Sequence, residues 1–263
     1  GRWSLVMLGI IVAAAIVLPP FLQDPAAQPC ILCSAEAPSL EHPFGTDDLS
    51  RDVLSRVVHG ARISLTVASL AVLVSMTLGA AVGLAAGYFG GWADVLLMRF
   101  VDGALAIPRL FLLLVLLAVL ESVPLWLLIL LLGTTGWLGT SRLVRGEVLR
   151  IREDSYVLAA RALGAARRRI ILRHLLPNAF GPLLVAATLA VGDVILLEAG
   201  LGFLGIGIRP PTPSWGGMIL SARSTFITAP WTSIFPGLAI MLTVLAVNLL
   251  GDAFRDAFDP RSA

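Results

Sequence analysis

The sequence predicts an all-α protein that crosses a membrane several times. Three observations predict this class: hydrophobic residues make up 57% of the 263 residues, charged residues make up only 14%, and the mean hydropathy is +0.90. Soluble domains carry about 25% charged residues, so a water-soluble fold is excluded. Apolar runs of about 20 residues, the length of a membrane helix, recur along the chain. We therefore expect a polytopic protein with six transmembrane helices.

The first predicted span, residues 3–22, carries no charge. It is followed by the longest polar stretch outside the central loop, residues 23–62, with six acidic residues against three arginines. We expect this stretch to lie outside the membrane and to end in a short amphipathic helix capped near Thr46 or Asp47. The span and the polar stretch together give a predicted N-terminal part, residues 1–60.

The second predicted span, residues 63–89, carries small residues four apart, at Ser75, Gly79, Gly83 and Gly87. This spacing places them on one helix face, where small side chains permit close helix packing in lipid. The charged helix 92–107 is expected along the interface or oblique to the membrane, and Pro108 ends or kinks it. Residues 110–120 form the core of the third span and residues 125–141 the fourth.

The central loop, residues 142–177, holds nine of the nineteen basic residues, all of them arginine. It is expected to contain two short helices. The first begins after an N-cap at Asp154 or Ser155, and Gly164 forms the corner that follows it. The second is expected to end at Pro177. On the first helix, Ala159, Ala160 and Leu163 share a face of little bulk, which another protein could approach closely.

The fifth predicted span covers residues 178–197 and ends near two acids, Asp193 and Glu198. An ionisable group at this depth is costly unless it faces protein or water, so these acids either line a substrate path or act as structural carboxylates. The four glycines of residues 199–207 indicate irregular backbone. The sixth span, residues 233–251, closes a predicted membrane domain, 61–252, before a tail, 253–263.

Loop charge predicts the orientation. With the arginine-rich central loop in the cytoplasm and six spans, both termini are cytoplasmic and the acidic segment 23–62 faces outward. In that outer location Cys30 and Cys33 could form a local disulfide or remain two free thiols. No metal site is predicted, because a site at these cysteines would need partners that the sequence does not place there.

Catalysis is not expected of this chain. It contains no lysine and hence no nucleotide-binding loop of the Gly-x-x-x-x-Gly-Lys type, so it is not itself an ATPase. Its histidines, His42, His59 and His174, all lie outside the apolar spans, which leaves no base within the membrane for a serine nucleophile. We predict no catalytic residue, no cofactor in this chain and no nucleic-acid partner.

The central loop resembles the cytoplasmic "EAA" loop of bacterial ABC-importer permeases. Ala159-Ala160, Gly164 and Leu176-Pro177 fall at the spacings of that motif. Two positions differ, because Leu158 stands where the family often has glutamate and His174 where it often has isoleucine. The resemblance implies an ATPase-coupling site made of Tyr156, Ala159, Ala160, Arg161, Leu163, Gly164, Leu176 and Pro177.

Other segments are similar to the C-type subunits of dipeptide and oligopeptide permeases, a family with relatives that carry nickel or glutathione. They are His42–Arg56, with Ser50 in place of the usual glycine, and Asp102–Pro108, Glu198–Gly205, Pro210–Gly216 and Asn248–Pro260. The resemblance implies the type I ABC importer permease (MetI-like) fold in a bacterial inner membrane. From the residues themselves, the costly acids and the glycines after them, we predict a translocation path or gate that includes Asp193, Glu198, Gly202 and Gly205.

The partners that this resemblance implies are a homologous second permease, two cytoplasmic ATPases that bind ATP and Mg, an external substrate-binding protein, and membrane lipid. The chain would then form half of the pathway for a peptide. The rival functions are an ion-coupled secondary transporter and a structural membrane anchor. Internal repeats with broken helices would favour the transporter, but glycine-interrupted helix occurs in only one half, at 199–207.

Overall fold

The structure is a computed structural model that describes residues 2–28, 33–120 and 123–258. These residues form helices joined by loops. The chain divides into two compact units, which we describe one at a time. Unit 1 comprises residues 1–69, 114–129 and 191–250, and unit 2 comprises residues 70–113, 130–190 and 251–263.

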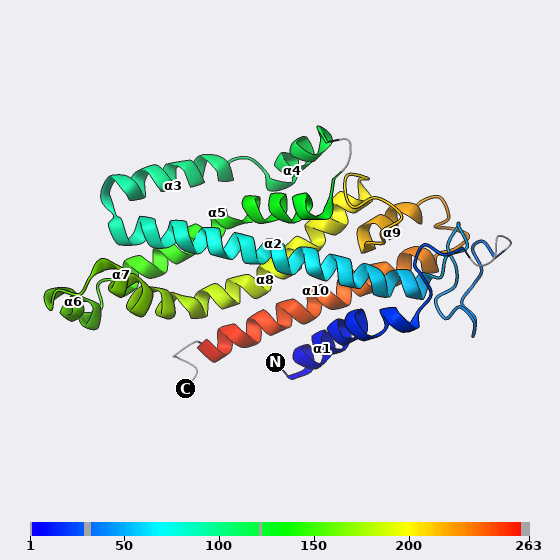
Figure 1. Cartoon of the computed structure of the whole chain (residues 1–263), viewed down its shortest axis with the longest axis horizontal. Coiled ribbons are helices and arrows are strands. Elements are labelled where there is room, and N and C mark those ends of the chain that lie inside the picture. Colours follow the sequence, from blue (N-terminus) through cyan, green and yellow to red (C-terminus); the bar gives the residue numbers. More distant parts are fainter. Residues whose placement is uncertain (1, 29–32, 121–122, 259–263) are drawn as a thin grey trace. The chain divides into compact units, whose positions relative to one another are not determined.

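The helices follow the predicted order (Figure 1). They are α1 (Arg2–Val17), a 3-10 turn (Pro19–Phe21), α2 (Val53–Phe89), α3 (Gly91–Leu105), α4 (Arg109–Ala118), α5 (Leu125–Ile151), α6 (Ser155–Ala162), α7 (Arg167–Ile170), a π-helix (Ile171–Leu175), α8 (Leu176–Phe203), α9 (Trp215–Ser221) and α10 (Trp231–Phe258).

Within the described residues, four helical stretches are long and apolar enough to cross a membrane: Val53–Phe89, Leu125–Ile151, Arg167–Phe203 and Trp231–Phe258. The pair α3 and α4 would be a fifth, and it is bent by 77° at the break that contains Pro108, as expected. Helix α1 is apolar but shorter. The count of six spans therefore stays a prediction.

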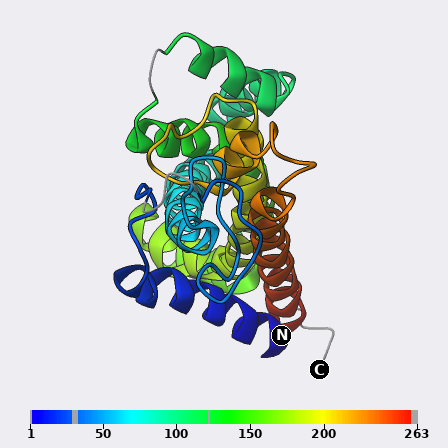
Figure 2. The same ribbon diagram turned by 90° about the vertical axis from the view of Figure 1, so that its right-hand side faces the viewer.

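In unit 1, two tryptophans attach later parts of the chain to the N-terminal segment. The indole N–H of Trp215 donates to the carbonyl of Val57 at 3.0 Å, and that of Trp231 donates to the carbonyl of Thr46 at 3.0 Å. Phe44 also stacks on Phe235, with ring centroids 3.9 Å apart. Figure 2 looks onto this end of unit 1, where the blue loop of the N-terminal segment lies in front of α2.

The helix expected to be capped near Thr46 or Asp47 begins later, at Val53. The carboxylate of Asp47 is occupied in a turn, where it accepts the N–H groups of Leu49 and Arg51 at 3.0 and 2.9 Å. Asp52 takes the capping position instead and accepts the N–H of Ser55 at 2.7 Å. From there the helix continues without a break into the second predicted span.

In unit 2, the close helix packing predicted for the small residues of α2 is confirmed. A Cβ atom on Gly83 would lie 2.6 Å from the carbonyl oxygen of Ser141, and one on Gly87 would lie 2.7 Å from the Val148 side chain. Both neighbours belong to α5. Any larger side chain on this face of α2 would push α5 away.

Three helices extend beyond the spans that the sequence predicted. Helix α5 continues past Ser141 to Ile151, because Arg142 and Arg145 in its extension pair with Asp102 and Asp94 of α3. Helix α8 continues to Phe203 and includes Gly200 and Gly202, so only the part after it is irregular. Helix α10 extends to Phe258, so residues 253–258, the part of the predicted tail that the structure describes, are helical.

Candidate functional site

The corner predicted at Gly164 is present at the end of α6 and has a specific hydrogen-bond pattern. Gly164 has φ +78°, the left-handed region that glycine enters at little cost. Its N–H donates to the carbonyl of Arg161 at 3.0 Å, and the N–H of Ala165 donates to the carbonyl of Ala160 at 3.0 Å. These two bonds are those of a Schellman motif, which satisfies carbonyls that a helix end would leave unpaired.

Helix α6 has one buried anchor and an exposed apolar surface. Val157 is fully buried, whereas Leu163 is 88% exposed and Leu158 and Tyr156 are also exposed. Ala159 is exposed and Ala160 is half-buried. An apolar surface on an eight-residue helix is unfavourable in water, and such surfaces mark contacts with other proteins. The exposed surface of α6 therefore suits a partner.

The second helix of the loop does not end at Pro177, contrary to the sequence prediction. It is a short α7, then a π-helix, and then α8 with Leu176 and Pro177 in its first turn. In the π-helix the N–H of Leu176 donates to the carbonyl of Ile171, one residue further back than in an α-helix. This wider turn accommodates the proline ring and its missing donor. The rings of Tyr156 and His174 lie 6.0 Å apart and join α6 to the π-helix.

The two acids of the predicted gate lie in different surroundings. Glu198 is only 1% exposed, and its Oε2 accepts the hydroxyl of Ser64 at 2.9 Å. Its Oε1 has no hydrogen-bond partner among the described residues. Asp193, five residues earlier on α8, is exposed. The structure thus gives Glu198 a hydrogen bond to α2, and a translocation role for either acid stays a prediction.

The glycines of the predicted gate lie where α8 meets α9. A Cβ atom on Gly202 would lie 3.0 Å from the backbone of Gly216 and Gly217, and one on Gly216 would lie 2.4 Å from the carbonyl oxygen of Ala199. Gly205 follows α8 with φ +78°. Backbone packs directly on backbone here, and only glycine permits that approach. The observed role of Gly202 is close packing.

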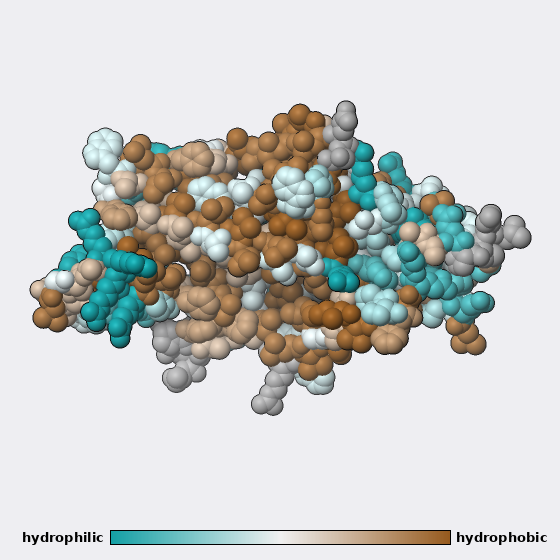
Figure 3. Space-filling view, viewed as in Figure 1, coloured by the Kyte–Doolittle hydropathy of each residue, from teal (hydrophilic) through white to brown (hydrophobic). Residues whose placement is uncertain are grey.

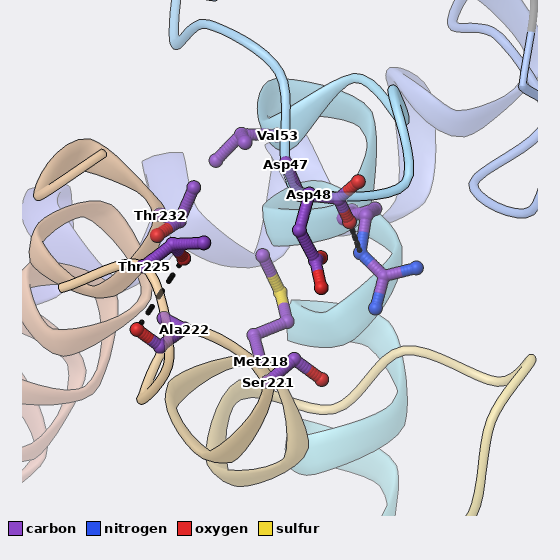
Figure 4. Close-up of a pocket in the computed structure, with 9 residues that line it drawn as sticks. Asp47, Asp48, Val53, Met218, Ser221, Ala222, Thr225 and Thr232 are labelled. Atoms are coloured by element: carbon purple, nitrogen blue, oxygen red, sulfur yellow. Dashed lines mark hydrogen bonds and ion pairs between the residues drawn. The ribbon is translucent and has the colours of Figure 1, made fainter. Parts of the chain in front are cut away.

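The external segment of unit 1 contains a buried charge cluster beside a small cavity. The carboxylate of Asp47 pairs with Arg51 at 2.7 Å and with Arg56 at 3.5 Å. Figure 4 shows the cavity between Asp47 and Asp48 on one side and Met218 and Ser221 on the other. Its volume is about 10 Å³, enough for one water molecule at most. It is too small to be a substrate site.

A larger open cavity in unit 1, about 550 Å³, is lined by residues that include Asp24, His59, Arg62 and Pro211. The possible disulfide between Cys30 and Cys33 stays a prediction, because Cys30 lies outside the described residues.

Sequence reasoning missed several residues that position these features. Val157 anchors α6, and Ser64 and Trp215 hold α8 and α9 to α2. Val157 and Ser64 stand in ordinary helical sequence, which carries no signal for such contacts. Trp215 could have been found as an anchor, because tryptophan buries a large apolar area and its N–H usually finds a hydrogen-bond partner when buried.

The comparisons with known proteins match this fold. The signature of the family "Binding-protein-dependent transport system inner membrane component" matches residues 79–263, more than half of the chain. The chain belongs to this family. As a permease component it is a multi-pass membrane protein of a transport system, and the family is one of non-catalytic subunits.

Two relatives of this permease are similar over most of its length. The dipeptide transport system permease protein DppC of Alkalihalophilus pseudofirmus is 44% identical over 227 residues, 86% of this chain and 74% of the relative. The glutathione transport system permease protein GsiD of Pectobacterium atrosepticum is 42% identical over 226 residues, 86% of this chain and 75% of the relative.

The permease also resembles a solved structure of the MetNI methionine ABC transporter in inward-facing conformations. The TM-score is 0.62 at 22% identity, over 78% of this chain and 97% of the other. This likeness confirms the MetI-like ABC permease fold that the sequence predicted.

Proposed function

We propose that this permease is a transmembrane subunit of an ATP-driven importer of dipeptides or oligopeptides. It would form half of the translocation pathway and couple to cytoplasmic ATPases through the loop of residues 153–177. Relatives named for dipeptide and glutathione transport, 42 to 44% identical, support a small peptide as the substrate. Family membership supports this function over an ion-coupled secondary transporter.

The observation that carries the coupling proposal is the exposed apolar surface of α6 and its glycine corner. Leu158, Ala159 and Leu163 are exposed on a helix that is anchored by buried Val157 and ended by Gly164. A rigid apolar helix that binds in a groove of another protein can follow the movement of that protein. The proposed coupling site is therefore α6 and the corner after it, with Leu176 and Pro177 at the start of α8.

The proposed assembly contains this chain, a homologous second permease, two ATPase subunits that bind ATP and Mg, and an external substrate-binding protein. It would reside in the inner membrane of a bacterium with both termini of this chain in the cytoplasm. This chain would supply no catalytic group, and alternating access would follow from ATP-driven movement of the ATPases against α6.

Copurification and uptake test the proposed function. We expect this chain to copurify with two ATPase subunits and a second permease. In vesicles the complex should take up a radiolabelled dipeptide only with ATP and the binding protein present. Collapsing ion gradients with ionophores should leave this uptake unchanged. Uptake by the chain alone, driven by an ion gradient, would contradict the proposal.

Labelling of introduced cysteines tests the orientation. In a background without Cys30 and Cys33, we expect Asp48→Cys to react with an impermeant maleimide added outside intact cells, and Arg168→Cys to react only after permeabilisation. Asp48 is the better external site because it is exposed, whereas Asp47 is buried against Arg51. The reverse pattern would place the arginine-rich loop outside and overturn the proposed topology.

A further inference from the structure

The arginines between residues 142 and 173 fall into two sets by what they contact. Each of the first four, Arg142, Arg145, Arg150 and Arg152, forms an ion pair with an acidic side chain of this chain. The later ones, from Arg161 onward, form no ion pair within the part of the chain that the structure describes. Four of these later arginines, Arg167, Arg168, Arg169 and Arg173, lie close together, and we name them the basic turn.

The basic turn presents its charges outward. All four arginines are exposed, whereas two apolar residues of the same helical stretch, Ile170 and Leu175, are buried and anchor it. Figure 3 shows the teal, hydrophilic side chains gathered over α6 and α7. Four fixed positive charges without an internal partner repel one another, so an anionic group from outside the chain would stabilise them.

The position of the basic turn along its helix indicates which anionic group that is. Residues 167–203 form one helical stretch that is apolar enough to cross a membrane, and we take the start of α8 at Leu176 as the edge of the hydrocarbon. With a rise of about 1.5 Å per residue, Arg173 lies about 5 Å and Arg167 about 14 Å outside that point. The headgroup layer extends roughly 5 to 8 Å beyond the hydrocarbon on each side. With the hydrocarbon boundary at Leu176, Arg173 lies near the outer edge of the headgroup layer and Arg167 lies about 6 to 9 Å past that edge, a distance that the long arginine side chain can span.

We propose that the basic turn binds the phosphate groups of anionic phospholipids at the membrane surface. The planar guanidinium group suits phosphate, because it donates two parallel hydrogen bonds. An ATPase is the rival occupant. The surface of α6 proposed to meet an ATPase is apolar, however, whereas the basic turn continues the axis of a membrane helix.

Native mass spectrometry of the purified complex, titrated with phosphatidylglycerol or phosphatidylcholine, tests this proposal. Each basic residue near an anionic surface contributes about fivefold in affinity. We therefore expect the triple substitution Arg167→Gln, Arg168→Gln and Arg169→Gln to weaken phosphatidylglycerol binding on the order of 100-fold. Arg168→Gln alone should weaken it about fivefold, and phosphatidylcholine binding should not change.

Arg142→Gln is the matched control, because it removes an arginine that is already paired with Asp102. It should leave phosphatidylglycerol binding within about twofold of wild type, since an exposed ion pair contributes little to stability. Unchanged phosphatidylglycerol affinity in the triple and single variants would overturn the proposal. If the triple variant kept that affinity but lost its ATPase subunits, the basic turn would be an ATPase contact instead. The measured quantity is lipid affinity and not uptake, so a failure of this proposal is distinguishable from a failure of the proposed transport function.

Discussion

Gly216→Leu is expected to destabilise the permease by about 3 kcal/mol or more, because it forces apart two backbones in contact. A Cβ atom at this position would lie 2.4 Å from the carbonyl oxygen of Ala199 and 2.7 Å from its Cα atom. Neither atom can move without shifting α8. The measurement is the midpoint of thermal unfolding in detergent, together with the yield of folded protein.

Gly200→Ala is the control for that prediction. Gly200 lies next to Ala199 on α8, and a Cβ atom there would meet no atom within 4 Å. Alanine also has a higher helix propensity by about 1 kcal/mol, so the midpoint should stay unchanged or rise. A wild-type midpoint in Gly216→Leu would show that α9 does not pack on α8 this closely, and the gate proposed at Gly202 would regain support.

Gly164→Val is expected to abolish ATP-driven uptake while leaving membrane insertion and docking of the external binding protein intact. Gly164 has φ +78°, and no atom lies within 4 Å of the position of its Cβ. The substitution therefore meets no neighbour and acts through the backbone alone. A β-branched residue in this region costs about 1 to 3 kcal/mol, so the Schellman motif should open and Leu163 should move from its place at the end of α6.

Two further variants separate this backbone effect from a change in side-chain size. Gly164→Asn should keep most of the uptake, because asparagine tolerates the left-handed region. Ala165→Val places the same valine side chain one residue later, where φ is not positive, and should also keep it. Uptake and ATPase copurification are measured for all three variants in reconstituted vesicles. Wild-type uptake in Gly164→Val would mean that residues 153–177 form an ordinary basic loop, and the importer proposal would lose its main structural support.

The features that were predicted correctly depend on local sequence. The apolar runs of α2 and α10 predict helices because a membrane helix must satisfy its own backbone hydrogen bonds. The spacing of Gly79, Gly83 and Gly87 predicts close packing because helical periodicity places them on one face. The corner at Gly164 follows from the conformational freedom of glycine. Each of these features needs only a short window of sequence to be predicted.

Only the tertiary structure decided which hydrogen bonds and ion pairs the polar groups form. Asp47 could have capped a helix, but its carboxylate accepts the backbone N–H of Arg51 and pairs with the Arg51 side chain. Pro177 would have ended a helix if the preceding turn had not widened to the π form. The sequence left open whether Glu198 lines a path or is a structural carboxylate, and only the fold shows that a serine 134 residues away contacts it in a buried site. A hydrogen bond forms only where a donor and an acceptor lie close together in space. For residues far apart in the sequence the fold sets that distance, and the local sequence around either residue carries no information on it.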